Sequence, residues 1–351
     1  MKVLGIETSC DECAAAVVED GEKILSNVVM TQIPFHARYN GVVPEIASRK
    51  HTEWIHAVTK EAIDKADLKV SDIDAVAATS RPGLFGSLLV GLTFAKAFAW
   101  ARDIPFIAVD HMLAHLYAPR MIPENRPDYP FLGLLVSGGH TIICRADNFD
   151  DITVMGTTID DAVGEAFDKV AKFYNFGYPG GKVIDDMSRN GDSEAFRFPM
   201  PSLHKGGLIM GQNGRSSEAH RYDVSYSGLK TAVTNQIEMF RVKKQEIKNE
   251  DIAASFQKTA VEILLRALLN AVEDTGISVI VAGGGVAANS YLRSRLAERK
   301  CLRCVFPPPD LCGDNGAMIA GIGYHYLARG ERSPLNTAAS ARVTGFKKKY
   351  P

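Results

Sequence analysis

The sequence predicts an α/β protein built from two similar lobes. Residues 2–18 and 131–146 each contain an apolar strand, a short turn of small or polar residues, and a second apolar strand. Residues 74–101 and 278–298 each contain a strand, a glycine turn and a helix, which is the pattern of an α/β crossover. This weak internal duplication predicts two facing lobes, with one hairpin tip from each lobe directed into a nucleotide-binding cleft.

Composition and charge restrict the class of protein. The chain has 351 residues, of which 46% are hydrophobic and 23% are charged, as expected for a globular protein with a large core. Its formal net charge of -1 provides no overall attraction to nucleic acid, so RNA contacts would need local patches or partner subunits. Glu7 comes too early for a signal peptide, and the apolar stretch 87–101 is too short and interrupted to span a bilayer. We therefore expect a cytoplasmic protein.

Two further helices can be placed from their end signals. Asp160 precedes the amphipathic stretch 161–174 and is predicted to be its N-cap. Residues 249–273 are predicted to form a long helix that ends at Gly276. Residues 177–227 are rich in Gly, Pro and Ser, and we expect this stretch to be irregular and to carry a mobile insertion.

The six cysteines include two C-x-x-C pairs, Cys10/Cys13 and Cys301/Cys304. The pairs lie almost a chain length apart, so a shared zinc site would need distant segments to meet. Reduced thiols are the favoured interpretation.

The stretch "HMLAH", residues 111–115, suggests a metal site. Histidines at i and i+4 lie on one helical face, and these two follow the predicted strand 106–110, where ligand sites of α/β proteins usually lie. A metalloprotease H-E-x-x-H motif would need a glutamate at position 112 as general base, but Met112 stands there. Local evidence favours a metal site and a purely structural histidine pair about equally.

Asp314 in "LCGDNGAM" is the candidate third ligand, because it lies on a glycine-flanked turn before an apolar helix. Two histidines and one aspartate suit zinc or iron and leave coordination positions open for substrate oxygens. The common alternative role for Asp314 is the N-cap of the following helix, which local evidence favours.

Other polar residues could contact a nucleotide. The stretch "GGGVAANSYL", residues 283–292, would let a phosphate or a flat ring approach the backbone, and Asn289 could donate to a base or sugar. It lacks the Lys-Ser/Thr ending of a P-loop. Asp168 and Asp185 could bind the ribose hydroxyls, although a salt bridge or a solvent-facing position is the commoner fate of a single Asp.

Several motifs together resemble one family. In order they are "GIETSCDE", "HMLAH", "LLVSGGHT", "GEAFDKVAK", "YPGG", "SYSGLKT", "AGGGVAAN" and "CGDNGAM". The chain is similar to the tRNA N6-adenosine threonylcarbamoyltransferases of the TsaD type, once labelled O-sialoglycoprotein endopeptidases. This resemblance implies the duplicated fold of actin, Hsp70 and sugar kinases. We expect lobe I to comprise residues 1–108 and 318–345, and lobe II residues 109–317.

The resemblance also implies roles for individual residues. The metal ligands would be His111, His115 and Asp314. The nucleotide and its phosphate would lie against Leu135, Val136, Ser137, Gly138 and Gly139. The adenosine of the donor would be held by Asp168, Gly181, Asp185 and Asn289. The catalytic polar residues would be Asp11, Glu12 and His140, which lie at the two predicted hairpin tips.

The implied reaction transfers threonylcarbamoyl from threonylcarbamoyl-AMP to the exocyclic amine of the adenosine 3′ of the anticodon, in tRNAs that read codons beginning with A. Iron or zinc would act as a Lewis acid, and AMP would leave. The implied partners are tRNA, a synthase that makes the donor, a non-catalytic TsaB-like paralogue and a TsaE-like P-loop ATPase. The alternatives are an ATP-dependent small-molecule kinase of the same fold and a non-enzymatic nucleotide-binding module. The histidine pair disfavours the kinase, because Mg²⁺ prefers oxygen ligands.

The chain departs from the family pattern at a few positions. Cys13 stands where Thr is usual, and Gly313 stands where Thr or Ser is usual. Arg81 replaces a Gly before Pro-Gly. The stretch 201–222 is longer than expected. None of these changes removes an implied ligand.

Overall fold

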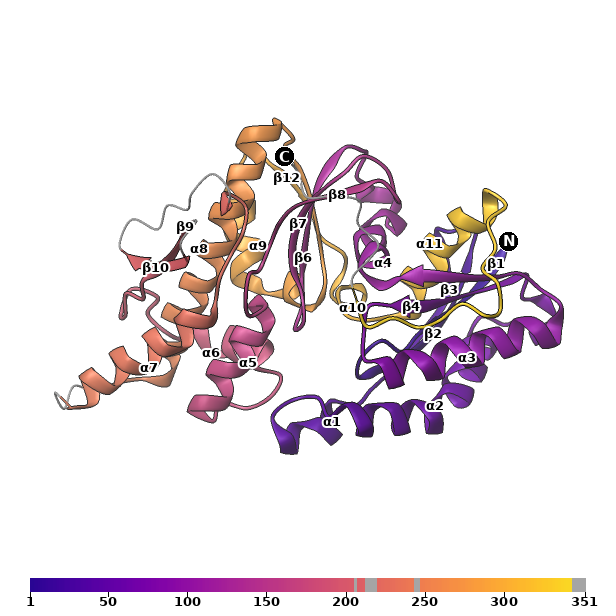
Figure 1. The fold of residues 1–351 in the computed structure, drawn as a ribbon, viewed down its shortest axis with the longest axis horizontal. Coiled ribbons are helices and arrows are strands. Elements are labelled where there is room, and N and C mark those ends of the chain that lie inside the picture. Colours follow the sequence, from indigo (N-terminus) through magenta and orange to yellow (C-terminus); the bar gives the residue numbers. More distant parts are fainter. Residues whose placement is uncertain (205–206, 212–219, 243–246, 343–351) are drawn as a thin grey trace. The chain divides into compact units, whose positions relative to one another are not determined.

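The computed structural model describes residues 1–204, 207–211, 220–242 and 247–342, which form two compact units (Figure 1). Of these residues, unit 1 contains 1–128, 148–152 and 305–342, and unit 2 contains 129–147, 153–204, 207–211, 220–242 and 247–304. The predicted lobe boundary at residue 108 lies inside unit 1, because the segment after it packs against the last helix of that unit.

Unit 1 is built around a five-stranded sheet of order β3-β2-β1-β4-β5. The strands are β1 (Lys2–Glu7), β2 (Glu12–Glu19), β3 (Lys23–Thr31), β4 (Ala75–Arg81) and β5 (Phe106–Asp110). The predicted first hairpin is confirmed, since β1 and β2 pair antiparallel from Lys2↔Glu19 to Glu7↔Ala14. On its other side β1 pairs parallel with β4, and β4 pairs parallel with β5.

The helices of unit 1 cover both faces of this sheet (Figure 1). They are α1 (Ile33–His36), α2 (Pro44–Lys65), α3 (Phe85–Arg102), α4 (His111–Tyr117), α10 (Pro309–Cys312) and α11 (Gly316–Ala328). Short 3₁₀ turns span Ala37–Tyr39, Val70–Asp72, Ala118–Met121 and Pro123–Asn125. Strand alternation places Leu4 and Ile6 in one core with α2 and α3, whereas Gly5 between them faces α11.

The contact between β1 and α11 requires glycine. A Cβ atom on Gly5 would lie 2.2 Å from the carbonyl oxygen of Gly316, and a Cβ atom on Gly316 would lie 2.5 Å from the backbone nitrogen of Ala16. The backbones of the first hairpin and of α11 therefore approach more closely than side chains permit. This close approach fixes the start of α11, and with it Asp314, against the first hairpin.

Unit 2 repeats the arrangement of unit 1. Its sheet has the order β12-β11-β6-β7-β8 and consists of β6 (Phe131–Val136), β7 (Thr141–Ala146), β8 (Ile152–Thr157), β11 (Val279–Gly283) and β12 (Arg303–Val305). The first strand again pairs antiparallel with the second and parallel with the crossover strand. The predicted duplication of a hairpin and a crossover is therefore confirmed.

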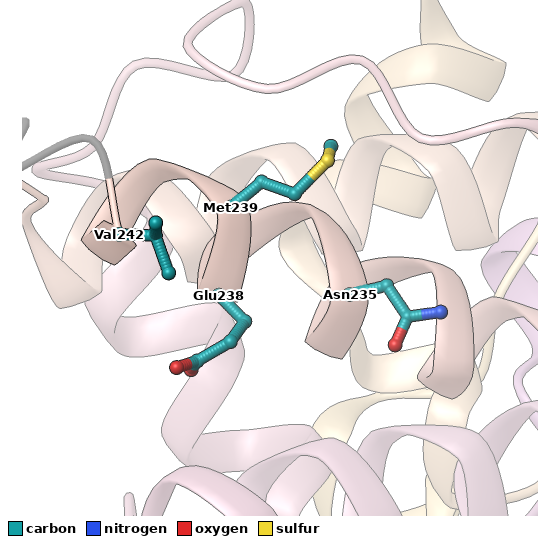
Figure 2. Close-up of a pocket in the computed structure, with 4 residues that line it drawn as sticks. All are labelled: Asn235, Glu238, Met239 and Val242. Atoms are coloured by element: carbon teal, nitrogen blue, oxygen red, sulfur yellow. The ribbon is translucent and has the colours of Figure 1, made fainter.

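The helices of unit 2 are α5 (Val163–Tyr174), α6 (Gly180–Ser188), α7 (Ser227–Val242), α8 (Asn249–Thr275) and α9 (Ser290–Ala297). A 3₁₀ turn, Gly285–Ala288, precedes α9. Helix α8 ends as predicted, with Gly276 in the left-handed conformation at φ 68°. Figure 2 shows Asn235, Glu238, Met239 and Val242 on α7, where they line a pocket that includes none of the predicted site residues.

Two predictions about unit 2 were wrong. Asp160 does not cap α5, whose N-cap is Ala162 without a side-chain hydrogen bond. The carboxylate of Asp160 instead accepts hydrogen bonds from the hydroxyls of Ser225 and Ser227 and the amide of Tyr226. The stretch 177–227 is not irregular throughout, because it contains α6 and an antiparallel hairpin of β9 (Met200–His204) and β10 (Gly207–Gly211). The predicted mobile insertion lies partly outside the described residues, at 205–206 and 212–219.

No helix among the described residues is both long enough and apolar enough to cross a membrane.

Candidate metal centre and nucleotide-binding residues

The three predicted metal ligands converge in unit 1. Strand β5 leads directly into α4, and the carboxylate of Asp110 caps this helix by accepting from the amides of Met112 and Leu113. The capped helix presents both of its histidines on one face. The donor atoms of His111, His115 and Asp314 all lie within 4.8 Å of one another.

The spacing of the donor atoms fits a single transition-metal ion. The Oδ1 atom of Asp314 lies 3.1 Å from Nε2 of His115 and 3.5 Å from Nε2 of His111. Two ligands bound tetrahedrally to one zinc ion at their usual bond lengths lie roughly 3.4 Å apart. The distances and the nitrogen–nitrogen–oxygen donor set therefore both suit a zinc or iron site.

Glu7, a residue with no role predicted from the sequence, completes the geometry of His111. Its side chain is fully buried, and Oε2 lies 2.9 Å from Nδ1 of His111. Glu7 is itself held by the hydroxyl of Thr79 and by the backbone amide of Ser9, each at 2.5 Å. A carboxylate at Nδ1 keeps the proton on that nitrogen and leaves Nε2, which faces Asp314, as the ligand atom.

The charges of the site are strongly coupled. Burial disfavours the charged imidazole of His111, but the carboxylates of Asp314 and Glu7 outweigh it and raise the pKa of His111 to about 9. Burial and the neighbouring His111 lower the pKa of His115. The Nδ1 atom of His115 is buried without a hydrogen-bond partner among the described residues. The carboxylates of Asp314 and Glu7 thus favour positive charge at the two imidazoles, and a bound cation would also supply such charge.

The alternative role of Asp314 is excluded by its neighbour. The N-cap of α11 is Asn315, whose side chain accepts from the amide of Met318 at 3.0 Å. Asn315 also donates to the carbonyl of Gly313, which fixes the turn. The carboxylate of Asp314 is therefore directed at the two imidazoles, and the N-cap interpretation is wrong.

The tip of the first hairpin lies close to this cluster. Asp11 is buried, and the side chain of Glu12 accepts a hydrogen bond from the hydroxyl of Thr31 at 3.1 Å. Burial and the adjacent carboxylates of Asp11 and Asp314 raise the pKa of Glu12 well above its usual value. Asp11, Glu12 and the three candidate ligands therefore belong to one electrostatically coupled group in unit 1.

The second hairpin tip lies in unit 2. Leu135 and Val136 are buried at the end of β6. Two hydrogen bonds close the tip: the amide of Ser137 donates to the carbonyl of His140, and the amide of His140 donates to the hydroxyl of Ser137. A Cβ atom added to Gly138 or Gly139 would meet nothing within 4 Å. The space above the two glycines lets a ligand approach their backbone amides.

The four residues predicted to hold adenosine share one corner of unit 2. Asp168 on α5 accepts from the amide of Gly180, next to Gly181, at the start of α6. Asp185 on α6 accepts from the amide and hydroxyl of Ser290 on α9.

Asn289 caps α9 by accepting from the amide of Leu292, and its amide group donates to Gln257. Asp168 thus joins α5 to α6, Asp185 joins α6 to α9, and Asn289 joins the start of α9 to α8. The structure brings the four residues together, and a bound ligand would have to share their hydrogen-bonding groups.

The duplicated sheets and the His/His/Asp cluster define a class: an actin-, Hsp70- and sugar-kinase-like α/β protein with a candidate transition-metal centre. Among solved structures, a HypF from T. kodakarensis has a TM-score of 0.59 at 15% identity, covering 93% of this chain and 48% of that one. The (R)-2-hydroxyglutaryl-CoA dehydratase component A of Acidaminococcus fermentans has a TM-score of 0.55 at 14% identity, covering 93% and 99%. Identities this low support the fold alone.

A family model described as "TsaD: tRNA N6-adenosine threonylcarbamoyltransferase" matches residues 23–321. Proteins of that name are 65% identical in Treponema denticola, over 99% of both chains, and 54% identical in Treponema pallidum, over 99% of this chain and 95% of that one. The relative in Borreliella burgdorferi strain B31 is 51% identical over 100% and 96%. The chain belongs to the tRNA N6-adenosine threonylcarbamoyltransferase family and is a transferase that modifies tRNA.

Proposed function

We propose that the donor substrate is threonylcarbamoyl-AMP and that the reaction is assisted by a metal bound to His111, His115 and Asp314. The single observation that carries this proposal is the convergence of their three donor atoms at spacings that suit one ion. The acceptor would be the exocyclic amine of the adenosine 3′ of the anticodon, in tRNAs that read codons beginning with A. The alternative kinase is disfavoured, because two imidazoles are poor ligands for Mg²⁺.

The side chains at this site would determine which atoms bind the ion and which coordination positions stay open. His111 would bind through Nε2, because Glu7 occupies its other ring nitrogen, and three protein ligands leave open positions for substrate oxygens. Iron or zinc bound there would serve as a Lewis acid toward the donor's oxygens. Asp314 would bring one negative charge to the site and favour a divalent cation over a neutral ligand.

Glu12 is the best candidate for the proton acceptor. As the amine nitrogen bonds to the carbamoyl carbon, the bond from that carbon to the phosphate oxygen breaks, AMP leaves with the electron pair, and the amine loses a proton. A carboxylate with a raised pKa is a better base near neutral pH than an ordinary one, and burial and Asp11 raise the pKa of Glu12. Asp11 would orient this group, and His140 in unit 2 remains an additional polar candidate.

In unit 2, Leu135 to Gly139 would lie against the phosphate and nucleotide, with the glycine amides as donors to the oxyanion. Asp168, Gly181, Asp185 and Asn289 would hold the adenosine. By family resemblance the partners would be tRNA, a threonylcarbamoyl-AMP synthase, a non-catalytic TsaB-like paralogue and a TsaE-like P-loop ATPase. A net charge of -1 agrees with tRNA binding that is shared among subunits in the cytoplasm.

The test is transfer of labelled threonine to unmodified tRNA, with the synthase, ATP, bicarbonate and the partner proteins supplied. We expect label on tRNA with the wild-type protein and none with Asp314→Ala. Asp310→Ala is the matched control, because Asp310 is an exposed acid in α10 a few residues before Asp314 and should leave transfer unchanged. Phosphorylation of a small molecule without label on tRNA would support the kinase instead.

A further inference from the structure

Three successive carbonyl groups at the first hairpin tip are held by three different parts of unit 1. The carbonyl of Ser9 accepts from the amide of Leu84 at 2.7 Å, before α3. The carbonyl of Cys10 accepts from Nε2 of His51 on α2 at 2.8 Å. The carbonyl of Asp11 accepts from the amide of Gln32 at 2.9 Å, after β3. Only the hydrogen bond to the Cys10 carbonyl, called here the middle tether, is donated by a side chain. It alone can therefore be removed by a substitution that leaves the backbone donors in place.

The middle tether controls the part of the tip that carries Asp11. A peptide unit is planar, so a fixed carbonyl on Cys10 also fixes the amide of Asp11 and the Cα atom from which its carboxylate extends. Asp11 is buried and lies beside Glu12, whose pKa its carboxylate helps to raise. A rotation of this peptide would therefore displace a group of the proposed reaction centre.

His51 belongs to a buried cluster of hydrogen-bonding side chains that also contains Gln32 and His36. The amide of Val43 donates to Nδ1 of His36 at 3.3 Å, so the proton of His36 is on Nε2, which lies 3.2 Å from Oε1 of Gln32. A carbonyl can only accept, so the proton of His51 is on Nε2, which faces the carbonyl of Cys10. The side-chain nitrogen of Gln32 lies 3.5 Å from the unprotonated Nδ1 of His51 and 3.4 Å from Nε2.

The surroundings keep His51 in this donating form. The side chains of Gln32, His36 and His51 are completely buried. Burial lowers the pKa values of both histidines and keeps them neutral at neutral pH, although the carbonyl of Cys10 and nearby carboxylates oppose this shift for His51. Buried polar chains in which each group has its partner hold a single conformation, and Gln32 also anchors this one to the carbonyl of Ala47 in α2.

We propose that His51 is a positioning residue for the transfer reaction: its Nε2–H group holds the Cys10 carbonyl and so directs the Asp11 side chain. This inference rests on the proposed function, because it assigns Asp11 to that reaction. Among the described residues, the hydrogen-bonding neighbours of His51 are Cys10 and Gln32, and neither is a candidate metal ligand. His51 acts through the Cys10–Asp11 peptide, about 40 residues away in sequence.

The experiment compares three variants in the labelled-threonine assay. His51→Leu removes the donor, and His51→Gln replaces it with an amide N–H of similar reach. Thr59→Val is the control on the same buried face of α2, because the hydroxyl of Thr59 has no hydrogen-bond partner among the described residues. We expect His51→Leu to lower kcat by about 10- to 100-fold with KM for tRNA almost unchanged, and His51→Gln to regain most of it.

Thr59→Val should keep the wild-type kcat, and melting temperatures show whether each variant is folded. If His51→Leu cannot be obtained folded, His51→Asn, whose shorter amide cannot span the gap, takes its place. Equal losses in the Leu and Gln variants, or a wild-type kcat in His51→Leu, would overturn the proposal.

A crystal structure of His51→Leu gives a readout that does not depend on activity. We expect the Cys10–Asp11 peptide to rotate, and an unchanged peptide overturns the inference even if the wild-type enzyme transfers threonine. If the wild-type enzyme transfers no threonine, the proposed function fails, whatever the orientation of this peptide.

Discussion

Replacing Glu7 with Gln tests how the candidate metal centre is built. The carboxylate of Glu7 accepts from the amide of Ser9 through Oε1 and faces Nδ1 of His111 through Oε2. A glutamine of the same size has one oxygen and one NH₂ group, so it can accept from only one of these two donors. The other donor would face the NH₂ group, and the orientation of His111 would be lost or strained.

The expected loss of metal affinity follows from the strength of the hydrogen bond between Glu7 and His111. A hydrogen bond to a charged group contributes about 1.5–3 kcal/mol, and 1.4 kcal/mol is a factor of ten in an equilibrium constant. We therefore expect Glu7→Gln to weaken metal binding by about 10- to 100-fold, the range usual for partners of metal-bound histidines. Asp314→Ala removes a ligand and should weaken binding further.

Metal affinity is measured by titration with Zn²⁺ or Fe²⁺ against a chelator of known affinity, together with the metal content of the purified proteins. Glu19→Gln is the matched control, because Glu19 lies at the opposite end of the same hairpin, paired with Lys23. An affinity of Glu7→Gln equal to that of the wild-type protein would refute the assigned role of Glu7. Equal affinities in Asp314→Ala and the wild-type protein would refute the site itself.

Three other outcomes are expected. The transfer rate should fall as the pH falls through the raised pKa of Glu12, because the base must be ionised. Glu12→Gln should lower kcat by about 10²- to 10⁴-fold and should remove this limb of the pH–rate profile. Gly316→Ala should lower the free energy of unfolding in urea by about 1–3 kcal/mol, because the new methyl group would overlap the backbone of Ala16. Iodoacetamide should modify the exposed Cys301 in the folded protein but should modify Cys144 only after unfolding. The reason is that Cys144 is fully buried and burial raises its pKa to about 12. Mass spectra that show alkylation of Cys144 before unfolding would contradict this packing.

Local sequence patterns predicted the parts of the fold that depend on local physics. The two hairpins and both strand–turn–helix segments are apolar runs separated by glycine or polar turns, and both sheets contain them in the same order. Asp160 shows the limit of this approach. Its position resembles an N-cap, but its partners Ser225 to Ser227 lie about 65 residues away, and no local pattern identifies them.

The candidate metal centre was predicted except for Glu7. The i, i+4 spacing of His111 and His115 was sufficient to place them on one face, whereas the convergence of Asp314 depended on family resemblance. Glu7 appears in the sequence as the polar end of an apolar strand, and only the packing of β4 and α4 beside it makes it a buried partner of His111. A charged residue at the carboxyl end of a buried strand is the signal that could have identified it.

Unit 1 is discontinuous in sequence, and this has a consequence for synthesis on the ribosome. The histidines belong to its first segment, while Asp314 and α11 arrive after nearly all of unit 2. At 5–20 residues per second, the roughly 180 intervening residues take on the order of 10–40 s to emerge. During that time the sheet face later covered by α11 would be exposed, and the proposed metal site would lack Asp314. Chaperones and the supply of metal would therefore matter most in this interval.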